Sequence, residues 1–69
     1  MVGVFKTNVQ IENQSKIILS ILYKSFPSFK INFDLDDCDK ILRVQGVNIC
    51  KEKIIELVNT NGYQCEVLD

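Results

Sequence analysis

Three cysteines are the side chains of this chain best suited to nucleophilic, redox or metal chemistry, and histidine is absent. Cys38, Cys50 and Cys65 are an odd number at wide spacing, which is typical of reduced thiols rather than of a disulfide framework. We predict that Cys65 packs in the core as a small hydrophobic residue and that Cys38 is exposed in a turn. Cys50 is expected in the first turn of a helix, where the dipole could make it reactive, although semi-buried packing is the favoured alternative.

A cluster of aspartates raises the opposite possibility, a site for a hard cation such as Ca²⁺. Its members are Asp34, Asp36, Asp37 and Asp39. The glycine and the closing glutamate of a calcium-binding EF-hand loop are missing, so a solvated turn is the favoured interpretation. Catalysis is not indicated either, because no serine or threonine has an evident base and no glycine-rich phosphate loop is present. We therefore predict no enzymatic activity and no cofactor.

The composition is that of an ordinary globular domain, with 46% hydrophobic and 25% charged residues among 69. We predict a single domain over residues 1–69. Eight basic against nine acidic residues give a net charge of -1, which lacks the positive field that nucleic acids require. No apolar run approaches the roughly 20 residues of a spanning helix, and no signal-peptide pattern is present. We expect no nucleic-acid partner, no membrane insertion and a cytoplasmic location.

The first third of the chain predicts a strand followed by a helix. Residues 2–8 alternate, with Phe5, Thr7 and Val9 expected toward the core and Val4, Lys6 and Asn8 expected outward. From about Asn13 the pattern changes to that of an amphipathic helix. Its apolar positions are Ile17, Ile18, Ile21, Leu22 and Phe26. Asn13 and Ser15 supply capping side chains at its start, and Pro27 ends it.

The middle of the chain predicts a hairpin. Residues 29–36 alternate between apolar and polar side chains, which is the clearest strand pattern in the sequence. The aspartates that follow predict a turn, and residues 40–45 resume the alternation with Leu42 and Val44 on the inner face. Two antiparallel strands joined by an acidic turn are therefore expected.

The last third predicts a second helix and a closing strand. Asn48 is the expected N-cap of a helix that runs to about residue 61, and Gly62 is expected to end it in the left-handed conformation. Residues 63–67 then alternate as a strand. The full order is strand, helix, strand, strand, helix, strand. It predicts an α+β, ferredoxin-like βαββαβ sandwich, with a four-stranded antiparallel sheet and two helices on one face.

Several short motifs on these elements resemble the heavy-metal-associated domain, the family of small copper chaperones and of metal-binding domains in metal-pumping ATPases. The similar segments are FKTNV at 5–9, DKILRVQG at 39–46, II at 54–55 and NGY at 61–63. The resemblance covers essentially the whole chain and implies the same fold. Each motif can also be explained by packing and turn chemistry, so none of them is chemically specific.

The chemically specific motif of that family is a Cys-x-x-Cys pair between the first strand and the first helix, where two thiolates hold a Cu(I) ion. Aligning the Asn-Val dipeptide that precedes this pair puts Ile11 and Gln14 at the two cysteine positions. Isoleucine cannot ligate a metal, and glutamine offers only a neutral carbonyl oxygen that is unsuited to Cu(I). The metal function of the family is therefore not expected to carry over. We predict that Ile11 is at least half buried and that Gln14 is helical.

Two functions follow as hypotheses. The first is a non-enzymatic module of the heavy-metal-associated type that has lost its metal ligands and binds another protein or itself, through a surface formed by Ile11, Val4 and Ile41. The alternative is a residual carrier of copper or zinc that uses Cys50 or Cys38 between two chains. Regulation by a small molecule, as in other ferredoxin-like sensor domains, rests on fold analogy alone.

Overall fold

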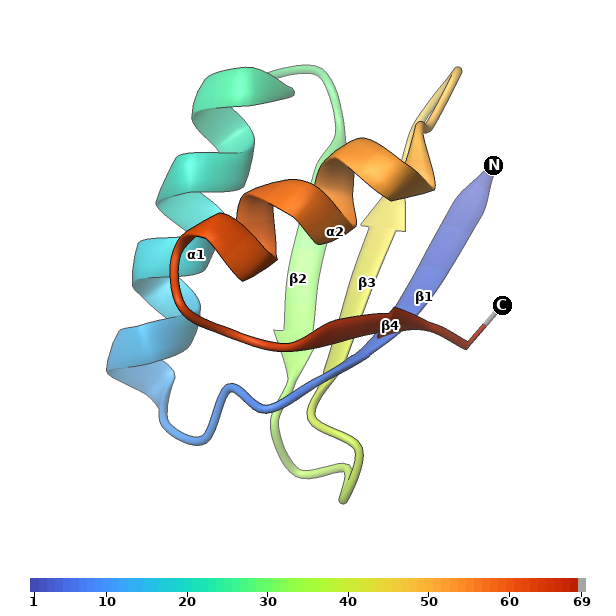
Figure 1. Ribbon diagram of the computed structural model, residues 1–69. Helices are drawn as coiled ribbons and strands as arrows, with labels where there is room; N and C mark the ends of the chain where they lie inside the picture. Colours follow the sequence, from blue (N-terminus) through green and yellow to red (C-terminus); the bar gives the residue numbers. More distant parts are fainter. Residues whose placement is uncertain (69) are drawn as a thin grey trace.

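The chain forms a four-stranded antiparallel sheet with both helices on one face, as Figure 1 shows. The structure, a computed structural model, describes residues 1–68. In chain order the elements are β1 (Val2–Thr7), α1 (Glu12–Ser25), β2 (Lys30–Asp34), β3 (Ile41–Gln45), α2 (Lys51–Thr60) and β4 (Cys65–Val67). The strand order β2-β3-β1-β4 and this element order are those of a ferredoxin-like α+β fold, which confirms the predicted fold class.

The two central strands form the floor of the core. The ladder between β1 and β3 pairs Phe5 with Leu42, so both side chains point to the helical face of the sheet. The predicted inward set of Phe5, Thr7 and Val9 is buried, as expected from the alternation. The largest fully buried side chains are Phe5, Val9, Ile18, Leu22, Leu42, Val44, Ile54 and Val58. Val9 comes from the loop after β1 and the others from both helices and both central strands, so a single core holds the two layers together.

Helix α1 begins at Glu12, with Ile11 as its N-cap residue. The prediction that Asn13 and Ser15 cap this helix is wrong, because both lie inside it and the Ser15 hydroxyl donates to the Glu12 carbonyl oxygen at 2.7 Å. The helix ends at Ser25. Beyond it, the rings of Phe26 and Phe29 stack with their centroids 5.0 Å apart.

One apolar position of α1 does not face the core. Ser15, Ile18 and Leu22 are buried at spacings of three and four residues, whereas Ile17 is 57% exposed. Successive helical residues are about 100° apart, so Ile17 lies beside the buried stripe rather than within it. The prediction of Ile17 as a core residue is therefore wrong.

Helix α2 begins later than the sequence predicts. Asn48 has a φ of 59°, in the left-handed region, and Cys50 rather than Asn48 is the N-cap residue. The end of the helix is as predicted. Gly62 has a φ of 92°, and its N–H donates to the Asn59 carbonyl oxygen at 3.0 Å. A residue with a side chain would be strained at this φ, which explains the glycine.

Candidate functional site

The junction between β1 and α1 is closed by its own hydrogen bonds. The Gln14 side-chain oxygen accepts from the backbone N–H groups of Gln10 at 2.9 Å and of Ile11 at 3.4 Å. This is the glutamine half of a capping box, since Ile11 has no side-chain acceptor to supply the other half. Asn8 ties the junction to the segment before β4 by accepting from the Gln64 N–H at 2.7 Å. Gln14 is helical, as predicted, and it stabilises the loop that precedes it.

Ile11 is 55% exposed, so the prediction that it is at least half buried is wrong. The backbone of Ile11 is extended, with φ −129° and ψ 160°, and its carbonyl oxygen accepts from Ser15 N–H in the first helical turn. Val9, two residues earlier, is fully buried and already fills the core position that the junction offers. The N-cap position therefore leaves the Ile11 side chain in solvent.

Ile11 belongs to a larger apolar surface along α1. Gln14, Ile17 and Ile21 are spaced by three and four residues along one side of α1, and Ile11 precedes them as the N-cap residue. We refer to these four residues as the α1 flank. Ile11 and Ile17 are both more than half exposed, and Ile21 is half-buried. The α1 flank thus combines two exposed isoleucines with a half-buried one at the start and on the first turns of the helix.

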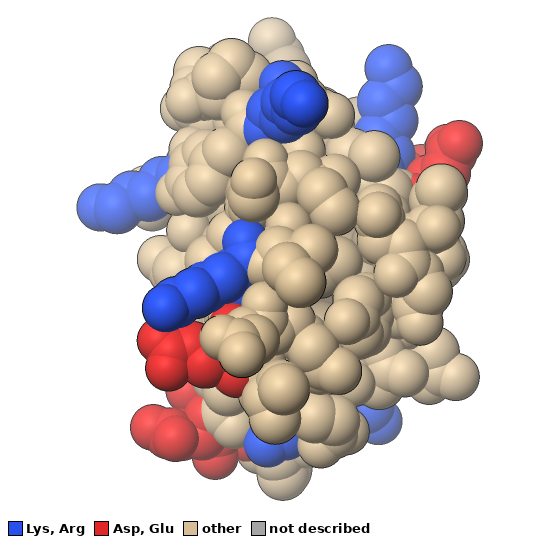
Figure 2. Space-filling model, turned by 90° about the vertical axis from the view of Figure 1, so that its left-hand side faces the viewer, with Lys and Arg blue, Asp and Glu red and all other residues tan. Residues whose placement is uncertain are grey.

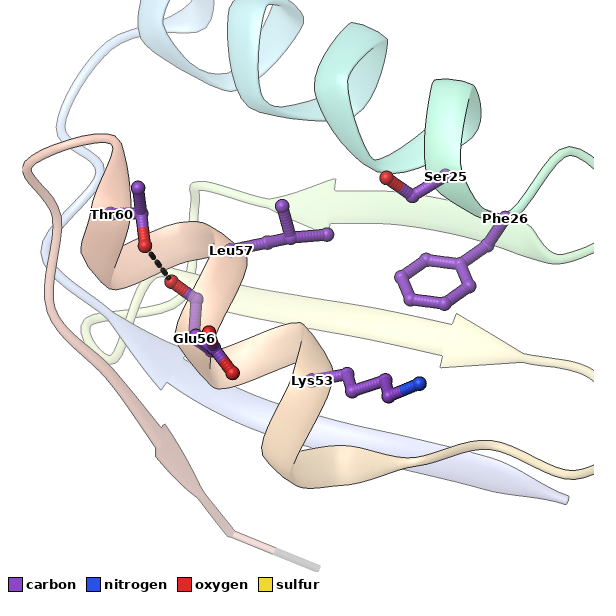
Figure 3. A pocket seen from close by; sticks show the side chains of 6 residues that line it. All are labelled: Ser25, Phe26, Lys53, Glu56, Leu57 and Thr60. Atoms are coloured by element: carbon purple, nitrogen blue, oxygen red, sulfur yellow. Dashed lines mark hydrogen bonds between the residues drawn. The ribbon is translucent and has the colours of Figure 1, made fainter.

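A shallow groove between the two helices lies at the other end of the α1 flank. It has a volume of about 590 Å³ and is lined by Ser25, Phe26, Lys53, Glu56, Leu57 and Thr60. In Figure 3 the Leu57 and Phe26 side chains point into the space between α1 and α2. Ser25 follows Ile21 by one turn, so the groove continues the α1 flank toward the end of the helix. Its apolar floor and charged rim resemble a docking surface more than a catalytic pocket.

The open face of the sheet offers less apolar surface than the sequence indicates. Val4 is half-buried, but Ile41 is only 7% exposed, so the expectation of an exposed Ile41 is wrong. Ile41 lies in β3, which has a neighbouring strand on each side, and the ladder sets it opposite Asp34. A central strand is covered by side chains from both neighbours. The apolar candidates that are more than half exposed near α1 are therefore Ile11 and Ile17.

The three cysteines are separated in space as well as in sequence. Cys65 is 7% exposed, which confirms its predicted core position, and burial together with the nearby Glu66 charge raises the pKa of its thiol to about 12. Cys38 is exposed in the turn before β3, as predicted. Cys50 is also exposed, so the prediction of semi-buried packing is wrong. Because Cys38 and Cys50 flank opposite ends of β3, they do not form a pair within one chain.

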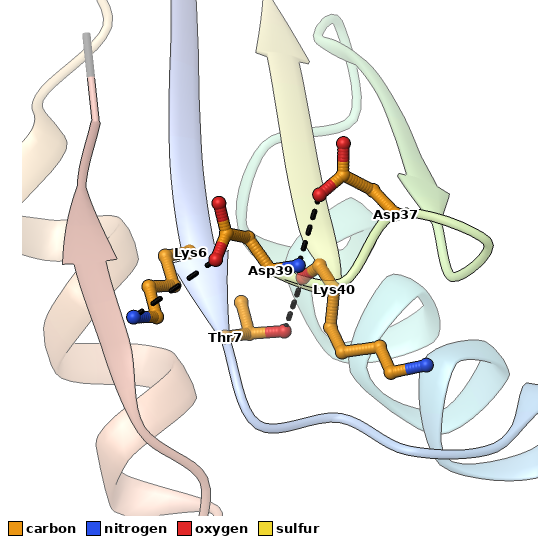
Figure 4. Close-up of polar contacts among 5 residues, drawn as sticks. All are labelled: Lys6, Thr7, Asp37, Asp39 and Lys40. Carbon is orange, nitrogen blue, oxygen red and sulfur yellow. Dashed lines mark hydrogen bonds and ion pairs between the residues drawn. The ribbon is translucent and has the colours of Figure 1, made fainter.

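The acidic turn is explained by contacts within the chain. Ligand atoms of Asp37, Cys38 and Asp39 lie within 4.8 Å of one another. Figure 4 shows that the Asp37 carboxylate accepts from the Asp39 backbone N–H, at 2.9 Å, and that the Asp39 carboxylate lies 3.9 Å from the Lys6 ammonium. The Thr7 hydroxyl donates to the Lys40 carbonyl oxygen at 2.6 Å. These contacts fasten the turn to β1, whereas the sequence predicted only a solvated turn.

A second groove, of about 640 Å³, separates the first half of α1 from β2. Its charged lining consists of Glu12, Lys16, Asp34 and Asp36, and Phe33 contributes an apolar wall. Figure 2 shows acidic side chains gathered on the lower part of the face seen there, beside a wide area without charge. Three carboxylates against one ammonium give this groove an acidic excess.

Tyr23 has a role that the sequence analysis missed. Its hydroxyl accepts from the Ile31 backbone N–H and donates to the Ile31 carbonyl oxygen, both at 2.9 Å. The phenol thus occupies the outer hydrogen-bonding groups of β2, which is an outer strand of the sheet. The sequence signal for this role was a tyrosine on the polar side of the amphipathic helix. The residue that its hydroxyl bonds to depends on how α1 packs beside β2, which the sequence pattern does not give.

Comparisons with known protein families, curated proteins and solved structures find no match to this chain. Within residues 1–68, no helix is both long and apolar enough to cross a membrane.

Proposed function

We propose that this domain is a non-enzymatic protein-interaction module, built on a scaffold that resembles the heavy-metal-associated domain but lacks its metal ligands. The observation that carries this proposal is the exposure of Ile11 and Ile17 on the α1 flank. A domain of this size gains stability by burying isoleucine, so two isoleucines left more than half exposed, one at the N-cap and one within α1, favour a contact surface. The exposed position of Ile11 supports docking over a role in the core.

The hydrogen bonds of Gln14 support the metal-independent part of the proposal. Its side-chain oxygen already accepts from two backbone N–H groups of the loop, so it is engaged in capping. Neither Ile11 nor Gln14 supplies a soft ligand for Cu(I). The side chains at the start of α1 are therefore suited to hydrogen bonding with the preceding loop rather than to ligating a metal ion.

Capture of partners from an extract of the source cells tests the interaction surface. The variants Ile11→Glu and Ile17→Glu each place a charge on the α1 flank. The matched control is Val47→Glu, because Val47 is also an exposed apolar residue but lies in the loop between β3 and α2. We expect proteins retained by the wild-type domain and by the control to be lost from both flank variants. Equal retention by all four proteins would refute the α1 flank as the binding surface.

A metal titration tests the loss of the ion site. Under reducing conditions we expect the wild-type domain to bind Cu(I) no more tightly than micromolar. The double variant Ile11→Cys/Gln14→Cys restores two thiols at the spacing of the family motif, and we expect it to bind Cu(I) far more tightly. Tight binding by the wild type would contradict the proposed metal independence.

The alternative function is a metal carrier in which Cys38 or Cys50 of two chains hold copper or zinc between them. The proximity of the Cys38 thiol to the carboxylates of Asp37 and Asp39 is the observation that favours it. Titration of the wild type with Zn²⁺ and Cu(I), alongside Cys38→Ser and Cys50→Ser, decides between the two functions. Metal binding that either serine variant abolishes, accompanied by dimerisation, would favour the carrier.

A further inference from the structure

The outer edge of β2 has a defined hydrogen-bonding pattern. The backbone groups of Ile31 point away from β3, because both of them bond to the Tyr23 hydroxyl. Successive residues of a strand direct these groups to alternate sides, so those of Phe33 face the same outer edge. Phe33 also lines the open groove between α1 and β2. The edge of β2 therefore presents one residue closed by Tyr23 and one residue that is accessible.

The sequence of β2 is complementary to itself when two copies run antiparallel. Centring the pairing on Asn32 sets Ile31 opposite Phe33 of the second copy, and Lys30 opposite Asp34. Both opposed pairs occur twice in such a symmetric contact. Lys30 and Asp34 are exposed, and within residues 1–68 neither forms an ion pair in the single chain.

The hydrogen-bond pattern fits the same register. Ile31 and Phe33 are the residues whose backbone groups face outward, and this register pairs them with each other across the two copies. Lys30 and Asp34 have the same parity along the strand, so their side chains would meet on the open face of the joined sheet. Charge and hydrogen bonding therefore agree on one alignment.

We propose that the β2 edge is a pairing site for a second copy of this chain, and that the Tyr23 hydroxyl keeps it closed. Tyr23 must leave Ile31 before a second strand can bond there, because one N–H and one carbonyl oxygen cannot serve both partners in the same geometry. The site lies on a different surface from the α1 flank, so it does not depend on the proposed function.

Sedimentation equilibrium on the wild type and on Tyr23→Phe tests whether the Tyr23 hydroxyl prevents pairing at the β2 edge. The variant keeps the ring and loses both hydrogen bonds to Ile31. We expect a predominantly monomeric wild type and a dimeric variant, with a dimer dissociation constant lowered at least about tenfold. Tyr63→Phe is the control for loss of a phenol and should behave as the wild type does. A monomeric Tyr23→Phe, or a wild type that dimerises equally well, would overturn the proposal.

Charge reversal tests the register. In the Tyr23→Phe protein, Lys30→Asp alone sets two acidic residues against each other and should abolish the dimer. Adding Asp34→Lys exchanges the two charges within the chain and restores both opposed pairs, so we expect the dimer to return. A dimer that is indifferent to the single reversal, or that the exchange fails to restore, would contradict pairing through β2.

Cross-linking locates the contact directly. Asn32 would face its own copy across the two-fold axis, within disulfide reach of it. With Cys38 and Cys50 replaced by serine, we expect Asn32→Cys to form a cross-linked dimer on mild oxidation in the Tyr23→Phe protein. Glu66→Cys, at the middle of the outer strand on the other side of the sheet, should remain monomeric. Cross-linking at Glu66→Cys but not at Asn32→Cys would assign self-association to β4 and overturn the proposal.

Discussion

The two outer strands of this sheet meet the same physical problem in different ways. An outer strand exposes backbone N–H and carbonyl groups that can pair with another chain. In β2, the Tyr23 hydroxyl satisfies both outward groups of Ile31. β4 spans only Cys65–Val67, and Glu66 lies at its centre. An antiparallel self-pairing centred on Glu66 would set two glutamates opposite each other, which is destabilising.

The difference shows that one edge is protected by a removable side chain and the other by its length and charge. A hydroxyl can leave its partners by a side-chain rotation, whereas a short strand cannot become longer without refolding. The two edges also differ in burial, because Ile31 is 4% exposed in β2 whereas Val67 is 43% exposed in β4. The β2 edge is therefore the better packed of the two, and it is also the one whose backbone groups a side-chain rotation can free for pairing.

Truncating the side chains of Ile31 in β2 and Val67 in β4 should give the largest difference in stability between the two edges. Ile31→Ala removes a buried side chain, and we expect the free energy of unfolding to fall by about 3 kcal/mol. Val67→Ala removes atoms that are already largely in water, so its cost should stay below about 1 kcal/mol. Urea unfolding followed by circular dichroism measures both. Equal costs would show that the two edges contribute alike to the core.

Alkaline pH should affect β4 through its buried thiol. The pKa of Cys65 is raised by burial from 9.0 to about 12 in the folded protein. The unfolded chain therefore loses this proton first, and the stabilisation present below pH 9 is lost as the pH rises toward 12. The thiol should lower the free energy of unfolding by about 1.4 kcal/mol between roughly pH 8 and 10. Urea titrations should show a shallower pH dependence for Cys65→Ala, and parallel curves would contradict the assignment.

Removing the Tyr23 hydroxyl should have an intermediate effect on the monomer. Tyr23→Phe loses two hydrogen bonds, which we expect to lower the free energy of unfolding by about 1 to 2 kcal/mol at low protein concentration. In Tyr63→Phe the loss should be less than about 0.5 kcal/mol, because the hydrogen bond of Tyr63 to the Val58 carbonyl runs through its backbone N–H. At the same low protein concentration, where the variant is monomeric, hydrogen exchange at Ile31 should accelerate only in Tyr23→Phe. Unchanged exchange there would show that the phenol does not protect this edge.

Surface charges near β4 should contribute least. The Lys6 ammonium and the Asp39 carboxylate are 3.9 Å apart and about half exposed, so Lys6→Gln should change the free energy of unfolding by less than about 0.5 kcal/mol. The remaining effect should shrink further in high salt. A loss above 1 kcal/mol, on the order of a buried hydrogen bond, would mean that this ion pair organises the acidic turn.

The fold was predictable because alternation and turn residues agreed along the chain. Phe5 and Thr7 in β1, and Leu42 and Val44 in β3, followed a period of two in central strands, where both neighbours and one helical layer fix each side chain. Gly62 was predictable because few residues other than glycine adopt its φ readily. These are local properties of the sequence.

The site was less predictable because it depends on how elements pack. Ile17 and Ile41 are equally hydrophobic, yet one is exposed on a helix and the other is covered between strands. Tyr23 carried no sequence signal that named Ile31 as its partner. The exposure of Ile11 followed from Val9 filling the core first, which only the path of the loop decides.

The contact between Gln14 and its loop places a limit on what this helix start can become. The same side-chain position either caps the amides of Gln10 and Ile11 or carries a thiolate, but it cannot do both. A chain with cysteine in place of Ile11 and Gln14 would lose this cap whenever its ion is absent, and would depend on the metal to close the junction. With glutamine at position 14 the junction closes on its own, at any metal concentration.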